Sequence, residues 1–271
     1  MKSFFIAFSL LSQSVGFALS PPHAFEIQQE NAAFDQLLCF FGIPPNAEPE
    51  ELVAETQRLW YQSGKERWEL DARYEELRPQ LWPLFEKMGL FQALKPSKNH
   101  YDYALVNGAL LSSVEKRVAY LSSLCEQGIR FGQIVFLAGE RPLQAFEKEQ
   151  TSPLLSTERE MVEWVYRNSS LPKDLPVQFV DAPMRQKADG TWTRPHRSDT
   201  ILAWLTQNPK KGSCLAISNQ PHAAYEQAAA RRALPPSFQL ETVGPALTGS
   251  PSVALILETI AKQIYSTYST H

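Results

Sequence analysis

The sequence has few cysteines and little net charge, and each shortage excludes a class of protein. Its 3 cysteines in 271 residues, Cys39, Cys125 and Cys214, are an odd number and cannot all pair within one chain. Each lies in an apolar pattern, so we interpret them as buried free thiols that act as small hydrophobic side chains. The net charge of −3 gives no electrostatic basis for binding nucleic acid. We therefore expect neither a disulfide framework nor a nucleic-acid-binding protein.

The motifs of several common enzyme classes are also missing. No CxxC, HExxH or other Cys/His spacing indicates a metal site. No GxGxxG follows the first predicted strand, where VNGALLSS offers Gly108 alone, and this disfavours conventional dinucleotide binding. Neither GxxxxGK[ST] nor GxSxG occurs. Ser218, His222 and Asp199 could be combined into a hydrolase triad, but without the glycines of a nucleophile elbow we do not adopt it.

The N-terminus has the pattern of a secretory signal peptide. Lys2 provides a positive charge, Phe4–Leu11 is an apolar run of suitable length, and Ala18-Leu19-Ser20 offers small residues for cleavage. We predict a signal peptide over residues 1–20 and export, with the mature protein periplasmic or secreted. The alternatives are an uncleaved membrane anchor, which would be the one membrane contact, and an ordinary first helix. No cysteine lies at the cleavage position, so a lipoprotein anchor is not supported.

Residues 21–98 are predicted to form a helical segment. Apolar residues recur at helical spacing in three stretches, Glu26–Phe41, Glu48–Tyr61 and Lys65–Met88. Pro79 and Pro83 should kink or split the third. An aromatic stripe at this spacing is more typical of a core than of a ligand site.

Strands and helices then alternate through residues 99–271. The predicted strands are Tyr103–Val106, Gln133–Ala138, Val177–Val180, Ser213–Ser218 and Phe238–Val243. The predicted helices are Ser112–Gln127, Thr157–Arg167, Thr200–Gln207, Pro221–Ala233 and Val253–Tyr265, with Ser198-Asp199 capping the third. Such alternation requires crossover connections, so we predict a doubly wound α/β domain with a mainly parallel five-stranded sheet and helices on both faces.

Polar residues follow four of these strands and should meet at one edge of the sheet, where open α/β sheets bind ligands. The predicted strand-end residues are Asn107, Gly108, Gly139, Glu140, Arg141, Asp181, Ser218, Asn219, Gln220 and His222. His222 could act as an acid or base or contact an anion, or it could bond the turn of its own helix. Arg141 could clamp an anion, or it could form a surface ion pair with Glu140. Asp199 and Thr200 could aim helix N–H groups at an anion, but capping a helix is the simpler interpretation.

The order of these motifs resembles the YdcF/SanA/ElyC-like family of envelope-associated, Rossmann-like bacterial proteins. Leu137-Ala138-Gly139 corresponds to the family's glycine segment, and Thr157-Glu158 stands for its Ser-Glu helix start. Ser198-Asp199-Thr200 matches its threonine helix start, and Ile217–His222 matches its last strand-to-helix turn with the histidine in register. The similarity spans about residues 101–265. Two positions depart from the pattern, since Tyr225 replaces an arginine and Ala203 an asparagine.

This resemblance implies a nucleotide or S-adenosylmethionine as cofactor and a part in cell-envelope metabolism. Our leading hypothesis is an exported protein that binds a small anionic or nucleotide-like ligand at the strand ends. In it Asn107 and Asn219 orient the ligand, Glu140 and Glu158 supply carboxylates, Arg141 neutralises charge, and His222 is the tentative catalytic group. The alternative is a non-catalytic envelope or interaction protein that uses residues 25–98 as a partner surface.

Overall fold

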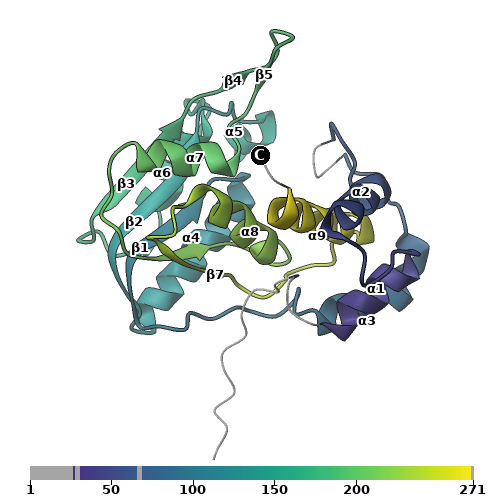
Figure 1. Ribbon diagram of the computed structural model, residues 1–271. Helices are drawn as coiled ribbons and strands as arrows, with labels where there is room; N and C mark the ends of the chain where they lie inside the picture. Colours follow the sequence, from purple (N-terminus) through teal and green to yellow (C-terminus); the bar gives the residue numbers. More distant parts are fainter. Residues whose placement is uncertain (1–26, 28–30, 66–68, 270–271) are drawn as a thin grey trace, which may run out of the picture.

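A computed structural model describes Ile27, residues 31–65 and residues 69–269, so the predicted signal peptide lies outside the described residues. The predicted Rossmann-like α/β fold is confirmed, with a five-stranded, all-parallel sheet in the order β3-β2-β1-β6-β7 (Figure 1). Its strands are β1 (His100–Asn107), β2 (Arg130–Gly139), β3 (Val177–Ala182), β6 (Ser213–Ile217) and β7 (Gln239–Val243). β1 begins three residues before the predicted strand, because its first residues alternate exposed and buried rather than forming an apolar run.

Helices cover both faces of this sheet. α4 (Leu111–Glu126) and α6 (Glu158–Arg167) contribute to a core on one face, and α7 (Arg197–Leu205) and α8 (Ala223–Ala233) to a core on the other. Successive residues of a strand point to opposite faces. Accordingly, Ala104 and Val106 belong to the first core, whereas Tyr103 and Leu105 belong to the second.

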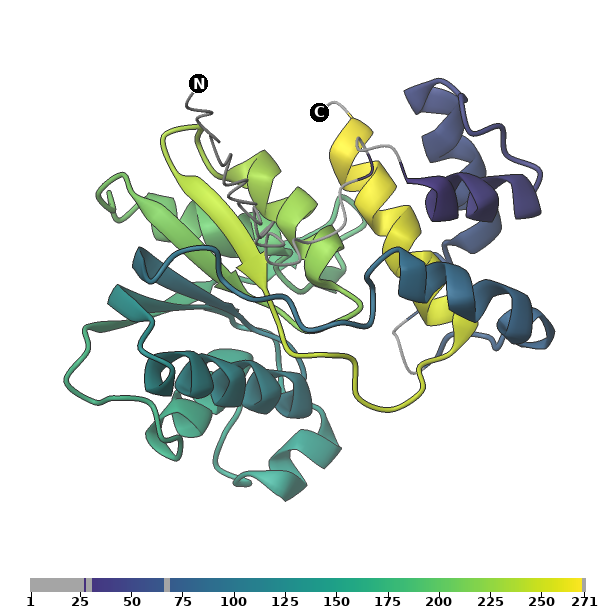
Figure 2. The same cartoon turned by 90° about the horizontal axis from the view of Figure 1, so that it is seen from below.

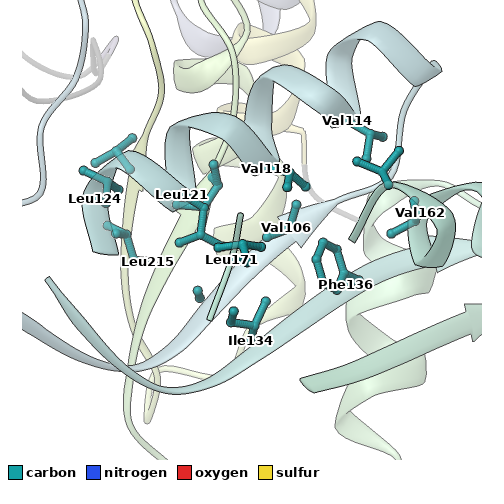
Figure 3. Close-up of a cluster of buried hydrophobic side chains, with 14 of the residues drawn as sticks. Val106, Val114, Val118, Leu121, Leu124, Ile134, Phe136, Val162, Leu171 and Leu215 are labelled. Carbon is teal, nitrogen blue, oxygen red and sulfur yellow. The ribbon is translucent and has the colours of Figure 1, made fainter. Parts of the chain in front are cut away.

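The first core shows how helical and strand periodicities meet. Val114, Val118 and Leu121 repeat along α4 at intervals of three and four residues, which places them on one side of the helix. Figure 3 shows this row above Val106, Ile134 and Phe136 of the sheet. α6 begins as predicted, with the Thr157 side chain accepting a hydrogen bond from Glu160 N.

A second, all-helical unit combines segments from both ends of the chain. α1 (Ala32–Phe40), α2 (Pro49–Trp60) and α3 (Arg78–Lys87) share one hydrophobic core with α9 (Val253–Tyr268). Figure 2 shows α9 lying between these helices and the sheet. Trp60 and Phe85 are buried in this core. The last helix of the predicted 99–271 domain therefore completes the core of the preceding segment.

Several local predictions were wrong. The stretch predicted as one helix over Lys65–Met88 is helical only in η1 (Glu75–Leu77) and α3, among its described residues. Tyr74 precedes them in the left-handed region with a φ of 65°, a conformation that ends regular helix. The structure also contains elements that were not predicted, α5 (Ala145–Gln150) and the hairpin of β4 (Arg185–Gln186) and β5 (Trp192–Thr193).

The cysteines and the helix lengths complete the description. All three cysteines are free, and Cys214 is buried as expected, but Cys39 is exposed and Cys125 only partly buried. Both of these lie near helix ends, where an apolar neighbourhood in sequence does not guarantee burial. Within the described parts of the chain, no helix combines the length and apolar character needed to cross a membrane.

Candidate functional site

The connections of the sheet reverse direction between β1 and β6. The chain passes from β1 through α4 to β2 on one side, and from β6 through α8 to β7 on the other. In doubly wound folds, ligands bind in the crevice outside the carboxyl ends of the strands at such a switch point. α4 contributes to the core on one face of the sheet, and α8 contributes Ala230 to the core on the other.

A buried group of charged side chains fills the switch point, and we name Asn107, Arg117, Arg197 and Glu226 the arginine–glutamate network. Arg117 Nη2 and Arg197 Nη2 each lie 2.7 Å from Glu226 Oε1. Asn107 Nδ2 donates to Glu226 Oε2 at 3.1 Å, and Arg117 Nη1 donates to the carbonyl oxygen of Asn107 at 2.7 Å. The side chains of Arg117 and Glu226 are both 1% exposed. Asn107 thus serves the internal network.

The network holds its carboxylate ionised and keeps one excess positive charge. Burial would raise the pKa of Glu226, but the charges of Arg117 and Arg197 outweigh burial and lower the pKa to about 2, helped by the Ser218 hydroxyl. Two guanidinium groups and one carboxylate leave one net positive charge. The Arg197 guanidinium lies 5.7 Å from the centre of the Tyr225 ring, so the residue at one departure from the family pattern contacts this arginine.

A second buried network surrounds Arg141. Its Nη1 and Nη2 bind Glu147 Oε2 and Oε1 at 2.8 and 3.0 Å, and its Nε donates to Glu158 Oε1 at 3.3 Å. The predicted partner of Arg141 was Glu140, and the surface ion pair between them is not formed, because Arg141 is buried. A Cβ atom added at Gly108 would lie 2.6 Å from Glu158 Oε2, so the lack of a side chain there leaves room for this carboxylate.

The two carboxylates beside Arg141 differ. Burial acts to raise the pKa of Glu147, but hydrogen bonds from Arg141 and from the Gln144 N–H lower it overall. Burial raises the pKa of Glu158, and the nearby charges of Arg141 and Arg194 offset this only in part. The side chain of Arg141 is therefore engaged with the protein's own carboxylates on both sides.

The remaining predicted residues near β2 and β3 make structural contacts. Glu140 Oε2 accepts a hydrogen bond from Met184 N at 3.2 Å, and burial together with the charge of Glu140 raises the pKa of Asp181. A Cβ added at Gly139 would lie 2.4 Å from Pro195 Cγ. These contacts explain why the residue types occur there without a ligand.

The start of α7 corrects a predicted cap. Ser198-Asp199 was expected to cap a helix from Thr200, but α7 begins at Arg197 and its N-cap is His196. Asp199 instead forms a capping box from the third helical position, with Oδ2 accepting from His196 N at 2.7 Å. Thr200 Oγ1 donates to the Arg197 carbonyl oxygen at 2.9 Å. Asp199 and Thr200 thus stabilise the helix start.

A cavity of about 270 Å³ lies beside the switch point, toward β7, and we name it the strand-end cavity. Three predicted residues, Asn219, Gln220 and His222, lie in its wall. The other lining residues are Ser113 and Lys116 of α4, Leu255 of α9, and Pro221, Pro245, Ala246, Leu247, Thr248, Ser250 and Pro251 of loops. These were not predicted, although Lys116 lies in the second turn of the helix that follows β1.

The wall of the strand-end cavity favours negative charge. It contains the cation of Lys116, which donates to Thr248 Oγ1 at 2.9 Å, and no carboxylate among its lining residues. Three helices begin at this wall, where Ser113 is in the first turn of α4, His222 is the N-cap of α8 and Leu255 is in the first turn of α9. Helix N-termini carry partial positive charge and stabilise anions. At α4 and α9 this charge already meets carboxylates of the protein, because Leu111 N donates to Glu147 Oε1 and Val253 N donates to Glu75 Oε2.

Neighbouring elements fix His222 and Gln220. The His222 side chain makes no capping hydrogen bond to α8, and its Nδ1 lies 3.0 Å from Thr259 Oγ1 of α9. Thr259 Oγ1 donates to Leu255 O at 2.8 Å, so it accepts a proton from Nδ1. Gln220 Nε2 donates to the carbonyl oxygens of Gly89 and Gln92, both at 3.0 Å. The cavity wall is thus joined to the helical unit.

Comparisons with protein families, curated proteins and solved structures give no match for this chain. In the described residues, His, Cys, Asp and Glu side chains form no group of three placed to hold a metal ion.

Proposed function

We propose that the protein binds a small anionic ligand in the strand-end cavity. The observation that supports this most is a cavity at the ligand-binding edge of the sheet whose lining residues include one lysine and no carboxylate. An anion placed there would gain from Lys116, without repulsion from an acidic lining residue.

The volume of the cavity favours small ligands. Its volume of about 270 Å³ is at the small end of ligand pockets, which span about 300–1,000 Å³. A phosphate or carboxylate compound of few atoms is therefore favoured. A dinucleotide is disfavoured, because the switch point that would hold its phosphates contains the arginine–glutamate network. Nucleotide or S-adenosylmethionine binding, which the family resemblance implies, has no separate support here.

His222 is the group in this proposal that could carry chemistry. Its bond to Thr259 orients the ring at the cavity wall, where it would contact the anion or exchange a proton with it. Whether a reaction follows depends on the ligand, so the proposal commits to binding.

A titration with inorganic phosphate tests the proposal. Lys116→Met removes the cation from the wall, and we expect at least about tenfold weaker binding, or about 1.4 kcal/mol, by calorimetry. Lys98→Met is the matched control, since Lys98 Nζ makes a similar bond, 2.8 Å to Gln239 Oε1, at the opposite edge of the sheet. Equal phosphate affinity in the wild type and Lys116→Met would contradict the proposal, as would a wild type that binds no phosphate.

We also propose export and a role in the cell envelope, on the signal-peptide pattern of residues 1–20 and the family resemblance. N-terminal sequencing of the protein from the cell envelope or medium should give a chain that starts after Ser20. An intact Met1 on all of the protein would contradict cleavage.

A partner-binding role for residues 25–98 is the second candidate function. The observation in its favour is a single exposed aromatic side chain, Phe40, with 44% of its surface accessible. Trp60 and Phe85 are instead buried against α9 and belong to the core. Phe40→Ser should abolish partner binding in a crosslinking assay while the phosphate affinity stays unchanged, and undiminished crosslinking would exclude this surface.

A further inference from the structure

Two leucines in the wall of the strand-end cavity belong to no hydrophobic core. Leu247 lies in the loop from β7 to α9, which Figure 2 shows, and Leu255 lies in the first turn of α9. Both are partly exposed, and neither packs into any of the three cores formed by the described residues. Ile256, the next residue of α9, is instead fully buried. The two leucines therefore leave apolar surface that a ligand in the cavity could cover.

Other apolar residues extend this surface. The apolar lining residues of the cavity are Pro221, Pro245, Ala246, Leu247, Pro251 and Leu255. The prolines have no N–H group to donate. The N–H groups of the leucines are already used, since Leu247 N donates to Phe91 O and Leu255 N donates to Ser252 Oγ. This part of the wall thus offers contact area and few hydrogen bonds.

The polar part of the wall offers one cation. Lys116 Nζ donates to Thr248 Oγ1 at 2.9 Å, and an ammonium group has three donors, so two remain for an anion. Gln220 Nε2 and Ser250 Oγ bond to the protein itself, the first to two carbonyl oxygens and the second to Arg78 Nη1. The wall therefore combines a single charged contact with an apolar surface. Ligand pockets typically have this composition, with few polar groups in a mainly apolar lining.

Resting on the proposed function, we propose that the ligand is an amphipathic anion, with a phosphate or carboxylate group on a hydrocarbon body of a few carbon atoms. The anionic group pairs with Lys116, and the hydrocarbon body packs against Leu247 and Leu255. The volume of about 270 Å³ limits the length of this body. A sugar body is disfavoured, because its hydroxyl groups would give up water for a surface that offers few hydrogen bonds.

Calorimetric titration with two phosphate esters tests this assignment. Methyl phosphate and n-butyl phosphate share the charged group and differ by three methylene groups. We expect the wild type to bind n-butyl phosphate at least about tenfold more tightly, because burial of methylene groups is favourable. The heat capacity change on binding should also be more negative for n-butyl phosphate. Acetate and pentanoate repeat the comparison with a carboxylate, and the tighter-binding series identifies the anionic group.

Substitution of the two leucines assigns the preference to the cavity wall. Leu247→Ser and Leu255→Ser should each reduce it to about threefold or less, whereas the affinity for methyl phosphate should stay unchanged. Leu202→Ser is the matched control, since Leu202 is a 52% exposed leucine of α7 that lies outside the wall. It should retain the full preference.

Three results would overturn the assignment. They are equal binding of the short and long anions by the wild type, an unchanged preference in both leucine variants, and an equal loss of preference in Leu202→Ser. Each would leave the proposed anion site intact, provided that binding stays sensitive to Lys116→Met. A wild type that binds none of the four anions and no phosphate would remove the proposed function as well. If a serine variant does not fold, the alanine variant at that position and the wild-type ratio decide.

Discussion

At the carboxyl edge of the sheet, charged side chains of two neighbouring regions differ in whether a side chain of opposite charge pairs with them. At the ends of β1 and β6, the arginine–glutamate network pairs buried charges within the protein. Beside β6 and β7, the strand-end cavity presents Lys116 with only a neutral hydroxyl as its bonded partner. Charged side chains fill the first region, whereas the second contains the strand-end cavity.

This difference is the reason that we propose the anion site beside β7 and not at the switch point. In the network, Glu226 cancels one of the two guanidinium charges, and the single positive charge that remains is shared by Arg117 and Arg197, whose side chains are only 1% and 14% exposed. Lys116 has no such carboxylate among the lining residues of the cavity. Topology alone would favour the switch point, whereas charge moves the expected site one strand further toward β7.

The largest effect on stability is expected from a substitution in the arginine–glutamate network. Glu226→Gln keeps the shape of the side chain but leaves Arg117 and Arg197 without their shared counter-charge. Removing one partner of a buried ion pair costs about 3–5 kcal/mol, and urea unfolding at neutral pH should show a loss of this order. Glu163→Gln is the matched control, because Glu163 pairs with Arg159 and Arg167 at the surface of α6. A surface pair contributes about 0–1 kcal/mol.

Lowering the pH should reduce the difference in the free energy of unfolding between the wild type and Glu226→Gln. The pKa of Glu226 falls from 4.5 to about 2 on folding, so the folded state binds fewer protons than the unfolded state at acidic pH. Its contribution to the free energy of unfolding is complete above pH 4.5 and is lost as the pH falls toward 2. Unfolding curves at pH 7, 4 and 3 should therefore show the wild type and Glu226→Gln converging. A constant gap over this range would mean that Glu226 is not held ionised by the arginines.

The smallest effect on stability is expected from a substitution in the wall of the strand-end cavity. Lys116 is exposed, so Lys116→Met should change the free energy of unfolding by no more than about 0.5 kcal/mol, even though it weakens phosphate binding. Thermal unfolding of both proteins without ligand measures this. A large loss of stability would show that Lys116 supports the fold. Its cation would then not be available to a ligand in the cavity.

The sheet was predictable from sequence because its signals are local. Short apolar runs such as QIVFLA and helical rows such as Val114, Val118 and Leu121 are determined by which faces are buried. The segment from Lys65 was mispredicted for the same reason, since aromatic residues at helical spacing suggested one long helix, whereas in the described residues helix begins only after Tyr74.

The site was only partly predictable because it is tertiary. Asn219, Gln220 and His222 directly follow a strand, and that position in sequence indicates the edge of the sheet. Lys116 and the loop from Pro245 to Pro251 reach the cavity only through the approach of α4 and α9, which no local pattern reports. Arg117 and Glu226 look like ordinary exposed helix charges in the sequence, and only their mutual contact buries them.

The position of α9 has a consequence for the order in which the protein matures. α1, α2 and α3 are synthesised before the sheet, but the apolar face that completes their core comes from α9, which is synthesised after the sheet. The loop that forms one side of the strand-end cavity directly precedes α9. During synthesis the three helices therefore lack part of their core until α9 has been made, and the cavity is complete only at that point.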